Sequence, residues 1–306
     1  MITEDLEIET GVGLSLNYKT YGLAKGEGES ILILHALTGN SNVTGINGWW
    51  KEIVGLDKVI DLNRYHVVAI DIPGNGTNGQ TVTNVEKYDS NWIGGLIAKT
   101  LQNDGYFNID MAFGVSLGGG LLWEIIVDNP VWVKKAFIIA AHWKSSPWLK
   151  GITHVQNEIL EHSVNPVEDA RKMAMLFYRS PEGFDKKFTR SNQTVGWLDY
   201  HGEALQNRFT LWSYRLMNHL LGSVNAIEGY GSFSIAVTPL KTEIIQVAIS
   251  SDILFSAEAN KDTHAELLKS GKSSIYEEID SVHGHDAFLK ESGQLEIIIN
   301  RHITIK

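Results

Sequence analysis

The sequence predicts an α/β fold in which a mostly parallel sheet is covered by helices on both faces. Short apolar runs, typical of buried parallel strands, alternate with longer stretches whose apolar residues recur at helical spacing. A Gly-x-Ser-x-Gly turn joins one of these runs to a helical stretch, and a long helical segment interrupts the alternation later in the chain. Regular alternation of strands and helices is the pattern of a parallel sheet with helices on its faces.

The expected strands and helices follow in chain order. Residues 5–21 are predicted to form a β-hairpin, because polar and apolar residues alternate around Gly11 and Gly13. The later strands are expected over Ile31–Leu34, His66–Ile70, Met111–Phe113, Ala136–Ala140, Ile244–Ile249 and the more polar Ser274–Ile279. Helices are expected between them over Asn91–Asn103, Leu117–Val127 and Ala257–Lys269.

Residues 142–238 break the alternation. This segment is rich in tryptophan, and its apolar residues recur at helical spacing. Its predicted helices are His154–His162, Pro166–Tyr178, Pro181–Phe188 and Glu203–Leu221. We therefore expect a core made of residues 1–141 and 239–306, with residues 142–238 inserted as a helical cap, or lid, whose apolar surface seals a pocket.

Composition limits the possible functions. The 306 residues suit one large domain or a core with an inserted subdomain, and the formal net charge of −10 disfavours nucleic acid or an anionic membrane as the main partner. No apolar run approaches the roughly 18 residues of a membrane span, and the acidic N-terminus lacks the features of a signal peptide. Without cysteine, disulfides and thiolate metal sites are impossible. A soluble cytoplasmic protein fits best.

Basic residues nevertheless gather in one stretch of the predicted cap. They are Arg171, Lys172, Arg179, Lys186, Lys187 and Arg190. Such a stretch is either a solvated helix face or a site for a small anionic ligand, since local clusters matter more than the net charge.

The Gly-x-Ser-x-Gly turn, Gly114 to Gly118 with Ser116 at its centre, has the form of a nucleophile elbow. In this motif a strand ends, the backbone turns sharply and a helix begins, so that the serine is exposed at the bend. The alternative is a glycine-rich turn without chemistry or a phosphate-binding turn. The sequence context decides between them.

A serine hydroxyl needs a base to take its proton, and the base needs a carboxylate to orient it. In the α/β-hydrolase fold these groups follow in the order serine, acid, histidine. Asp252 comes just after the predicted strand Ile244–Ile249, and His283 and His285 come after the last strand. Spacing alone leaves both histidines as candidates, and His285 is favoured because it leads into a helix. Asp286 is either part of the site or a helix N-cap.

The intermediate of acyl transfer also needs an oxyanion hole. One donor should be the backbone N–H of Leu117, which follows the nucleophile, and the other should come from the loop after an early strand. The N–H of Leu37 or a neighbour is the candidate there. His35 in the same loop is expected to shape the loop rather than act as the base, because the base should come last in the chain.

Six segments resemble motifs of the homoserine O-acetyltransferase family, which has the α/β-hydrolase fold. They are the oxyanion loop His35–Gly39, the elbow Gly114–Gly119, the cap helix Asp169–Ser180, the second cap motif Asp199–Gly202 leading to Arg208 and Phe209, the aspartate motif Ser251–Phe255, and the histidine motif Gly284–Leu289. The resemblance extends from about residue 30 to about residue 290. It assigns the base to His285.

The resemblance implies that Arg171, Tyr178 and Asp286 hold an amino-acid acceptor. Arg171 and Tyr178 are seven positions apart, so on a helix they share one face to within ~20°. A guanidinium can bind the acceptor's carboxylate and Asp286 its ammonium group. The implied reaction is a ping-pong transfer from acetyl-CoA, as co-substrate, through Ser116 to L-homoserine for methionine synthesis. The resemblance implies no tightly bound cofactor and no metal. It does imply a homodimer formed through the cap.

The chain also departs from the family pattern. It is shorter than expected, and Asp71–Gly79 replaces a longer segment rich in glycine and serine. Val115 and Leu117 flank the nucleophile where small residues or methionine are commoner. Three alternatives therefore stay open: a succinyl donor, L-serine or another alcohol as acceptor, and an esterase that uses the same serine. Besides an acyltransferase and an esterase, a scaffold without catalytic activity is a third class of function. The intact serine, aspartate and histidine disfavour it.

Overall fold

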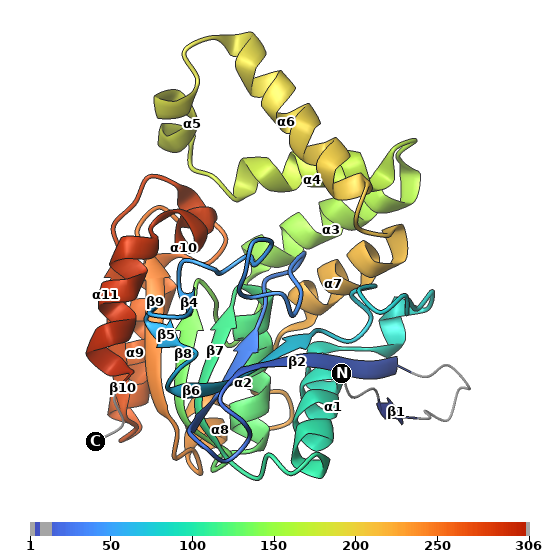
Figure 1. Ribbon diagram of the computed structural model, residues 1–306. Coiled ribbons are helices and arrows are strands. Elements are labelled where there is room, and N and C mark those ends of the chain that lie inside the picture. The colour runs from blue at the N-terminus through green and yellow to red at the C-terminus, as the bar shows by residue number, and fades with distance from the viewer. Residues whose placement is uncertain (1–3, 7–13, 304–306) are drawn as a thin grey trace.

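The computed structural model describes residues 4–6 and 14–303 (Figure 1). Within these residues an eight-stranded sheet has the order β1-β2-β6-β3-β7-β8-β9-β10. Its strands are β1 (Glu4–Leu6), β2 (Leu14–Gly22), β3 (Glu29–Leu34), β6 (Tyr65–Asp71), β7 (Ile109–Val115), β8 (Val133–Ile139), β9 (Glu243–Ile249) and β10 (Ser274–Ile279). β2 is antiparallel to β1 and β6, and all other neighbours are parallel. The predicted mostly parallel sheet is confirmed.

The predicted hairpin over residues 5–21 lies partly outside the described residues. β1 and β2 pair antiparallel with Leu6 opposite Leu14, and the connection over residues 7–13 is not among the described residues. β4 (Val54–Gly55) and β5 (Ile60–Asp61) form a separate two-stranded parallel pair that was not predicted. Two residues per strand are too few to show an apolar alternation.

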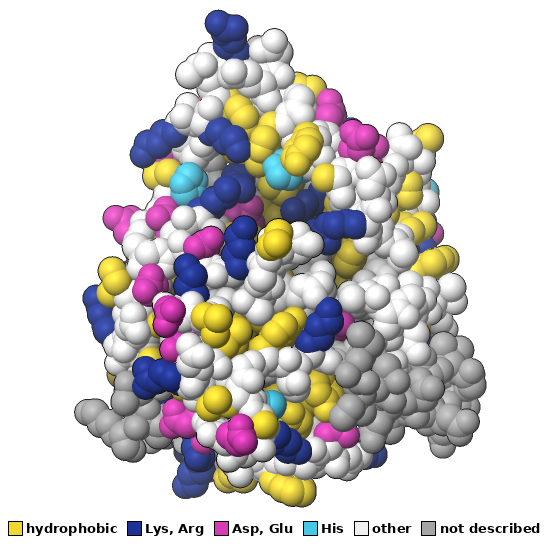
Figure 2. Space-filling model, viewed as in Figure 1, with side chains coloured by type: hydrophobic (Ala, Val, Ile, Leu, Met, Phe, Trp, Pro, Cys, Tyr) yellow, Lys and Arg dark blue, Asp and Glu magenta, His cyan; other side chains and the backbone are white. Residues whose placement is uncertain are grey.

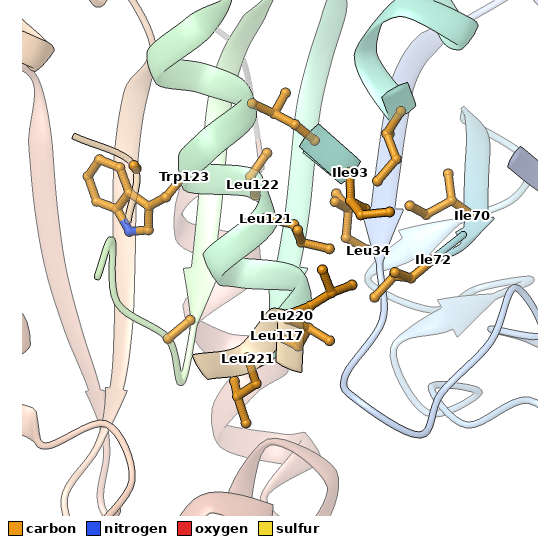
Figure 3. Close-up of a cluster of buried hydrophobic side chains, with 14 of the residues drawn as sticks. Leu34, Ile70, Ile72, Ile93, Leu117, Leu121, Leu122, Trp123, Leu220 and Leu221 are labelled. Carbon is orange, nitrogen blue, oxygen red and sulfur yellow. The ribbon is translucent and has the colours of Figure 1, made fainter. Parts of the chain in front are cut away.

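The sheet is buried on both faces because side chains alternate along each strand. In β3, Leu32 and Leu34 enter one hydrophobic cluster, and Ile31 and Ile33 enter the other. The first cluster includes α1 (Ser90–Asn103), α2 (Leu117–Asp128) and α9 (Ala257–Lys269), and the second includes α11 (Ser292–His302). Figure 3 shows part of the first cluster, where Leu117, Leu121 and Leu122 of α2 lie beside Leu34.

Five helices between β8 and β9 stand over the carboxyl edge of the sheet (Figure 1). They are α3 (Pro147–His162), α4 (Pro166–Phe177), α5 (Pro181–Lys187), α6 (Ser191–Gln206) and α7 (Leu211–Ser223). A sixth helix, α8 (Phe233–Val237), instead packs against the core, with the rings of Phe233 and Trp123 6.0 Å apart. α3–α7 therefore occupy the place expected for a cap.

Two helices of this region differ from the prediction. The single helix predicted over Glu203–Leu221 is wrong: α6 ends at Gln206, and α7 starts after Thr210, whose hydroxyl accepts the Ser213 N–H. α3 begins at Pro147, earlier than predicted, because Ser146 caps its N-terminus. α11 was not predicted, and the short η1 (Val85–Lys87), η2 (Gly284–Asp286) and α10 (Ala287–Lys290) complete the elements. None of the described helices is long and apolar enough to span a membrane.

The turn after β7 fits only because its glycines have no side chain. A Cβ on Gly118 would lie 2.3 Å from the Leu34 carbonyl oxygen and 2.6 Å from that of His35. A Cβ on Gly114 would lie 2.5 Å from the Gly118 carbonyl oxygen. The start of α2 is thus pressed against the end of β3, which places two loops of the carboxyl edge side by side.

We expect Gly118→Ala to lower the free energy of unfolding by about 3 kcal/mol, because the backbone oxygens it would meet cannot move aside. Urea unfolding followed by circular dichroism measures the change. Gly95→Ala in α1 is the matched control: no atom lies within 4 Å of its added Cβ, so it should stabilise the protein by about 0.5–1 kcal/mol. Equal effects of the two substitutions would contradict the packing described for Gly118.

Candidate active site

Ser116 occupies a strained turn between β7 and α2. Its φ of 54° and ψ of −120° lie in a region that a residue with a Cβ rarely adopts. The turn is held by the Ser116 N–H, which donates to the Ile139 carbonyl at 2.9 Å, and by the Ser116 carbonyl, which accepts the Gly119 N–H at 2.8 Å. This backbone conformation directs the serine side chain to the carboxyl edge of the sheet.

The structure brings Ser116, His285 and Asp252 together in one chain of hydrogen bonds. His285 Nε2 lies 2.8 Å from Ser116 Oγ, and His285 Nδ1 lies 2.7 Å from Asp252 Oδ2. The other carboxylate oxygen of Asp252 accepts the N–H groups of Leu254 and Phe255, at 2.8 and 3.1 Å. All three functional side chains are at least 95% buried. This geometry is that of a nucleophile, a base and an orienting acid.

Electrostatics favour proton uptake by His285. Burial lowers its pKa, but the charge and hydrogen bond of Asp252, together with the charge of Asp286, outweigh burial. The pKa of His285 therefore stands above its usual value of 6.5. An imidazolium formed when the serine loses its proton is stabilised in place. The other candidate, His283, is partly exposed, and its Nε2 lies 3.9 Å from Glu291 instead of within this chain of bonds.

The proposed oxyanion donors come from the two loops that Gly118 brings together. Leu117 is the first residue of α2, and N–H groups in the first turn of a helix have no partner within the helix. Leu37 follows β3 and lines a cavity of about 10 Å³ together with Tyr178 and Leu254. This volume is close to that of a single water position.

His35 holds the loop that carries Leu37. Its Nε2 accepts the Ile72 N–H at 3.0 Å, so its Nδ1 carries the proton and donates to the Ala36 carbonyl at 2.7 Å. Burial lowers the pKa of His35 to about 4, which keeps the ring neutral. This is the structural role that the sequence favoured.

Arg171 and Tyr178 lie over the same edge of the sheet. The Arg171 guanidinium carbon is 5.3 Å from the centre of the Tyr178 ring, and that ring is 5.7 Å from the His285 ring. The Asp286 N–H donates to the Tyr178 carbonyl at 3.1 Å. Tyr178 and Asp286 thus lie next to His285, and Arg171 is linked to it through the Tyr178 ring.

Asp286 has a partner that the sequence analysis missed. Arg179 Nη2 lies 2.9 Å from Asp286 Oδ2, and both side chains are nearly buried. Arg179 belongs to the basic stretch and follows Tyr178 directly, so its position in that motif was the available signal. Lys172 and Lys186 of the same stretch pair with acidic neighbours on exposed helix faces, as a solvated face would. Arg208 also reaches the site and donates to the Thr38 carbonyl at 3.0 Å.

A larger cleft of about 740 Å³ shares Leu254 with the small cavity beside Leu37 and is also lined by Asp252. Its lining includes Trp143, Trp148, Phe255 and one cation, Lys144. Among the described residues no group of three histidine or acidic side chains could hold a metal ion.

Comparisons with known proteins show the fold family of the chain. The family model of the alpha/beta hydrolase fold matches residues 29–289. A homoserine O-acetyltransferase of Cyclobacterium marinum is 28% identical over 97% of this chain and 92% of its own length. The crystal structure of homoserine O-acetyltransferase from Bacillus anthracis has a TM-score of 0.86 at 15% identity, covering 100% of this chain and 97% of that one. Esterase E22 has a TM-score of 0.85 at 15% identity, covering 95% and 94%.

The opposing effects of burial and of the Asp252 charge on the pKa of His285 can be measured by NMR titration of its imidazole. We expect a pKa above 6.5 in the unchanged protein and below 6.5 in Asp252→Asn, because burial remains when the carboxylate charge is lost. Asp262→Asn on the exposed face of α9 is the control and should leave the titration of His285 in place. A pKa that does not fall in Asp252→Asn would contradict the assigned cause.

Proposed function

Because the chain belongs to the α/β-hydrolase fold family, we propose that it is a serine acyltransferase, a homoserine O-acetyltransferase that converts acetyl-CoA and L-homoserine to O-acetyl-L-homoserine and CoA. The observation that supports this proposal is the set of contacts that links Arg171 to the Tyr178 ring, and Tyr178 to both His285 and Asp286. A simple esterase has no need of charged groups that match an amino acid beside its base. Relatives named for this activity match nearly the whole chain.

The first half-reaction acylates Ser116. His285 Nε2 takes the hydroxyl proton while Ser116 Oγ attacks the thioester carbonyl. The N–H groups of Leu37 and Leu117 stabilise the negative charge that develops on the carbonyl oxygen. The C–S bond breaks, His285 returns the proton to the departing thiolate, and CoA leaves an acetyl group on the serine. Asp252 stabilises the imidazolium throughout.

The second half-reaction uses the same groups in reverse. The γ-hydroxyl of L-homoserine gives its proton to His285 and attacks the acetyl-serine carbonyl. The Ser116–acetyl bond breaks, and His285 returns the proton to Ser116 Oγ. Arg171 binds the acceptor's carboxylate. Its guanidinium lies over the face of the Tyr178 ring, so that Tyr178 contacts the acceptor beside it. Asp286 is already paired with Arg179, so an ammonium group binds by sharing this carboxylate with the guanidinium.

The cavity beside the oxyanion loop supports an acetyl donor over a succinyl donor. It measures about 10 Å³ and is lined mainly by apolar side chains, among them Leu37, Leu149 and Leu221. A methyl group suits such a space, whereas burying an additional carboxylate there would cost several kcal/mol without a cation. α3–α7, which we propose to be the cap predicted over residues 142–238, cover the site and keep water from the acyl-enzyme.

The proposed setting is a cytoplasmic homodimer without a tightly bound cofactor. Acetyl-CoA acts as a co-substrate, and nucleic acid and membrane are not expected partners at a net charge of −10. Exposed apolar side chains on the cap support a dimer through it, including Trp148 at 56% and Val164 at 94% exposure. Apolar surface of this kind is stabilised by contact with a second copy.

Release of free thiol from acetyl-CoA, measured with and without L-homoserine, tests the proposal. We expect homoserine-dependent release with O-acetylhomoserine as product, and a loss of at least about 10³-fold in Ser116→Ala. Ser234→Ala, an exposed serine of α8, is the control with unchanged rate. Equal release without acceptor would favour an esterase, and homoserine-dependent activity that survives in Ser116→Ala would remove the serine from the mechanism.

The acceptor role of Arg171 is tested by separating the half-reactions. In Arg171→Ala we expect the KM for L-homoserine to rise about 10- to 100-fold, the value of one or two charged hydrogen bonds. The single-turnover thiol burst from acetyl-CoA should change far less. Lys172→Ala is the matched control on the same helix, because Lys172 bonds only to Glu168, Asp169 and Asp199 among the described residues. An equal loss in both half-reactions would show that Arg171 does not act on the acceptor.

A further inference from the structure

A basic cluster surrounds His201 between the cap and the core. The centres of the His201 and Trp197 rings are 4.4 Å apart, and the Arg179 guanidinium, after α4, and the Lys187 ammonium, at the end of α5, lie 5.7 and 4.5 Å from the centre of the Trp197 ring. Arg171 in α4 and Lys290 at the end of α10 belong to the same cluster, because they also act on His201 electrostatically. Figure 2 shows Lys and Arg side chains around a hollow in the upper half of this face of the molecule. Positive charge is therefore concentrated there although the chain as a whole carries −10.

The cluster carries more positive charge than the ion pair of Arg179 with Asp286 neutralises. Burial, followed by the four cations, lowers the pKa of His201 to about 4, and burial, Arg179 and Lys290 lower that of Lys187. Among the described residues, neither Lys187 nor Lys290 takes part in a salt bridge. Like charges held together without counter-ions raise the energy of the empty site, and an anion bound among them relieves that repulsion.

Two of the four cations already have a function. Arg179 is paired with Asp286 at 2.9 Å, and Arg171 lies against Tyr178, where we place the acceptor's carboxylate. Lys187 and Lys290 remain. The Lys187 ammonium is held 4.5 Å from the centre of the Trp197 ring, so it is positioned rather than freely swinging. Lys290 is exposed.

Lys290 is linked to the reacting groups by its place in the chain, and Lys187 by a chain of contacts. Lys290 ends the short helix that starts directly after Asp286, within five residues of His285. Lys187 lines a small cavity with Arg179, whose guanidinium reaches Asp286. An extended ligand that places a thioester at Ser116 can therefore place its charged end at these lysines. The larger cleft offers one cation, Lys144, among mainly apolar side chains.

We propose that Lys187 and Lys290 bind the phosphate groups of the acyl donor, and that the donor's thioester arm runs from this cluster to Ser116. The inference rests on the proposed function for the identity of the donor, whose coenzyme A part carries three phosphate groups. It assigns the cluster to a phosphorylated thioester and leaves the acceptor at Arg171. The apolar cleft is then not the donor's phosphate site.

Binding of desulfo-CoA, measured by titration calorimetry, tests the site without turnover. In Lys187→Gln/Lys290→Gln we expect the dissociation constant to rise about tenfold or more, since two charge-assisted contacts are lost. Glutamine keeps part of the aliphatic stem against Trp197, which protects the fold. Lys241→Gln/Lys269→Gln removes the same charge from exposed positions elsewhere and should bind desulfo-CoA as the unchanged protein does.

A second measurement compares acetyl-CoA with S-acetylpantetheine, a donor without the nucleotide. The ratio of their kcat/KM values should fall about tenfold in the double variant. An unchanged dissociation constant, an unchanged ratio, or weakened binding in Lys144→Gln in place of the double variant would overturn the inference. Failure of the proposed function looks different: the unchanged protein would bind desulfo-CoA at the lysines and transfer no acetyl group to L-homoserine.

Discussion

The close approach of Gly118 to the carbonyl oxygens of Leu34 and His35 is the contact on which the rest of the site depends. It brings the loop after β3 to the start of α2, so that the two proposed oxyanion donors come from segments that lie side by side. The strained Ser116 backbone is kept by hydrogen bonds to Ile139 and Gly119. A strained backbone conformation of this kind persists only where the surrounding structure fixes the turn from several sides.

A second set of close contacts links the cap to the loop of His285. Gly284 has a φ of +64°, and a Cβ there would lie 2.6 Å from the Arg179 backbone. Ser180 Oγ donates to the Val282 carbonyl at 2.5 Å, and the Asp286 N–H donates to the Tyr178 carbonyl. These contacts position both the base and the residues proposed to hold the acceptor. A shift of the cap therefore changes the positions of both together.

The sequence was sufficient to predict the order of strands in the parallel part of the chain and the positions of Ser116, Asp252 and His285 just after strands. Buried parallel strands are continuous apolar runs, and the turn around Ser116 requires glycine at fixed positions, so both leave clear patterns. The break between α6 and α7 was missed because helical periodicity continues across Thr210, whose side-chain cap ends one helix and begins another. The pairing of Arg179 with Asp286 was missed because it joins residues more than a hundred positions apart. No local spacing reports such a contact.

The connection between β8 and β9 also explains how such a core can be reused. β3, β7, β9 and β10 carry the loops with the oxyanion donor, the serine, the aspartate and the histidine, and β8 carries none of these residues. A segment inserted after β8 leaves the pairing of every strand in the sheet intact. Segments of different length can therefore be inserted at this point without changing the order of the strands, provided that they keep the contacts with the His285 loop.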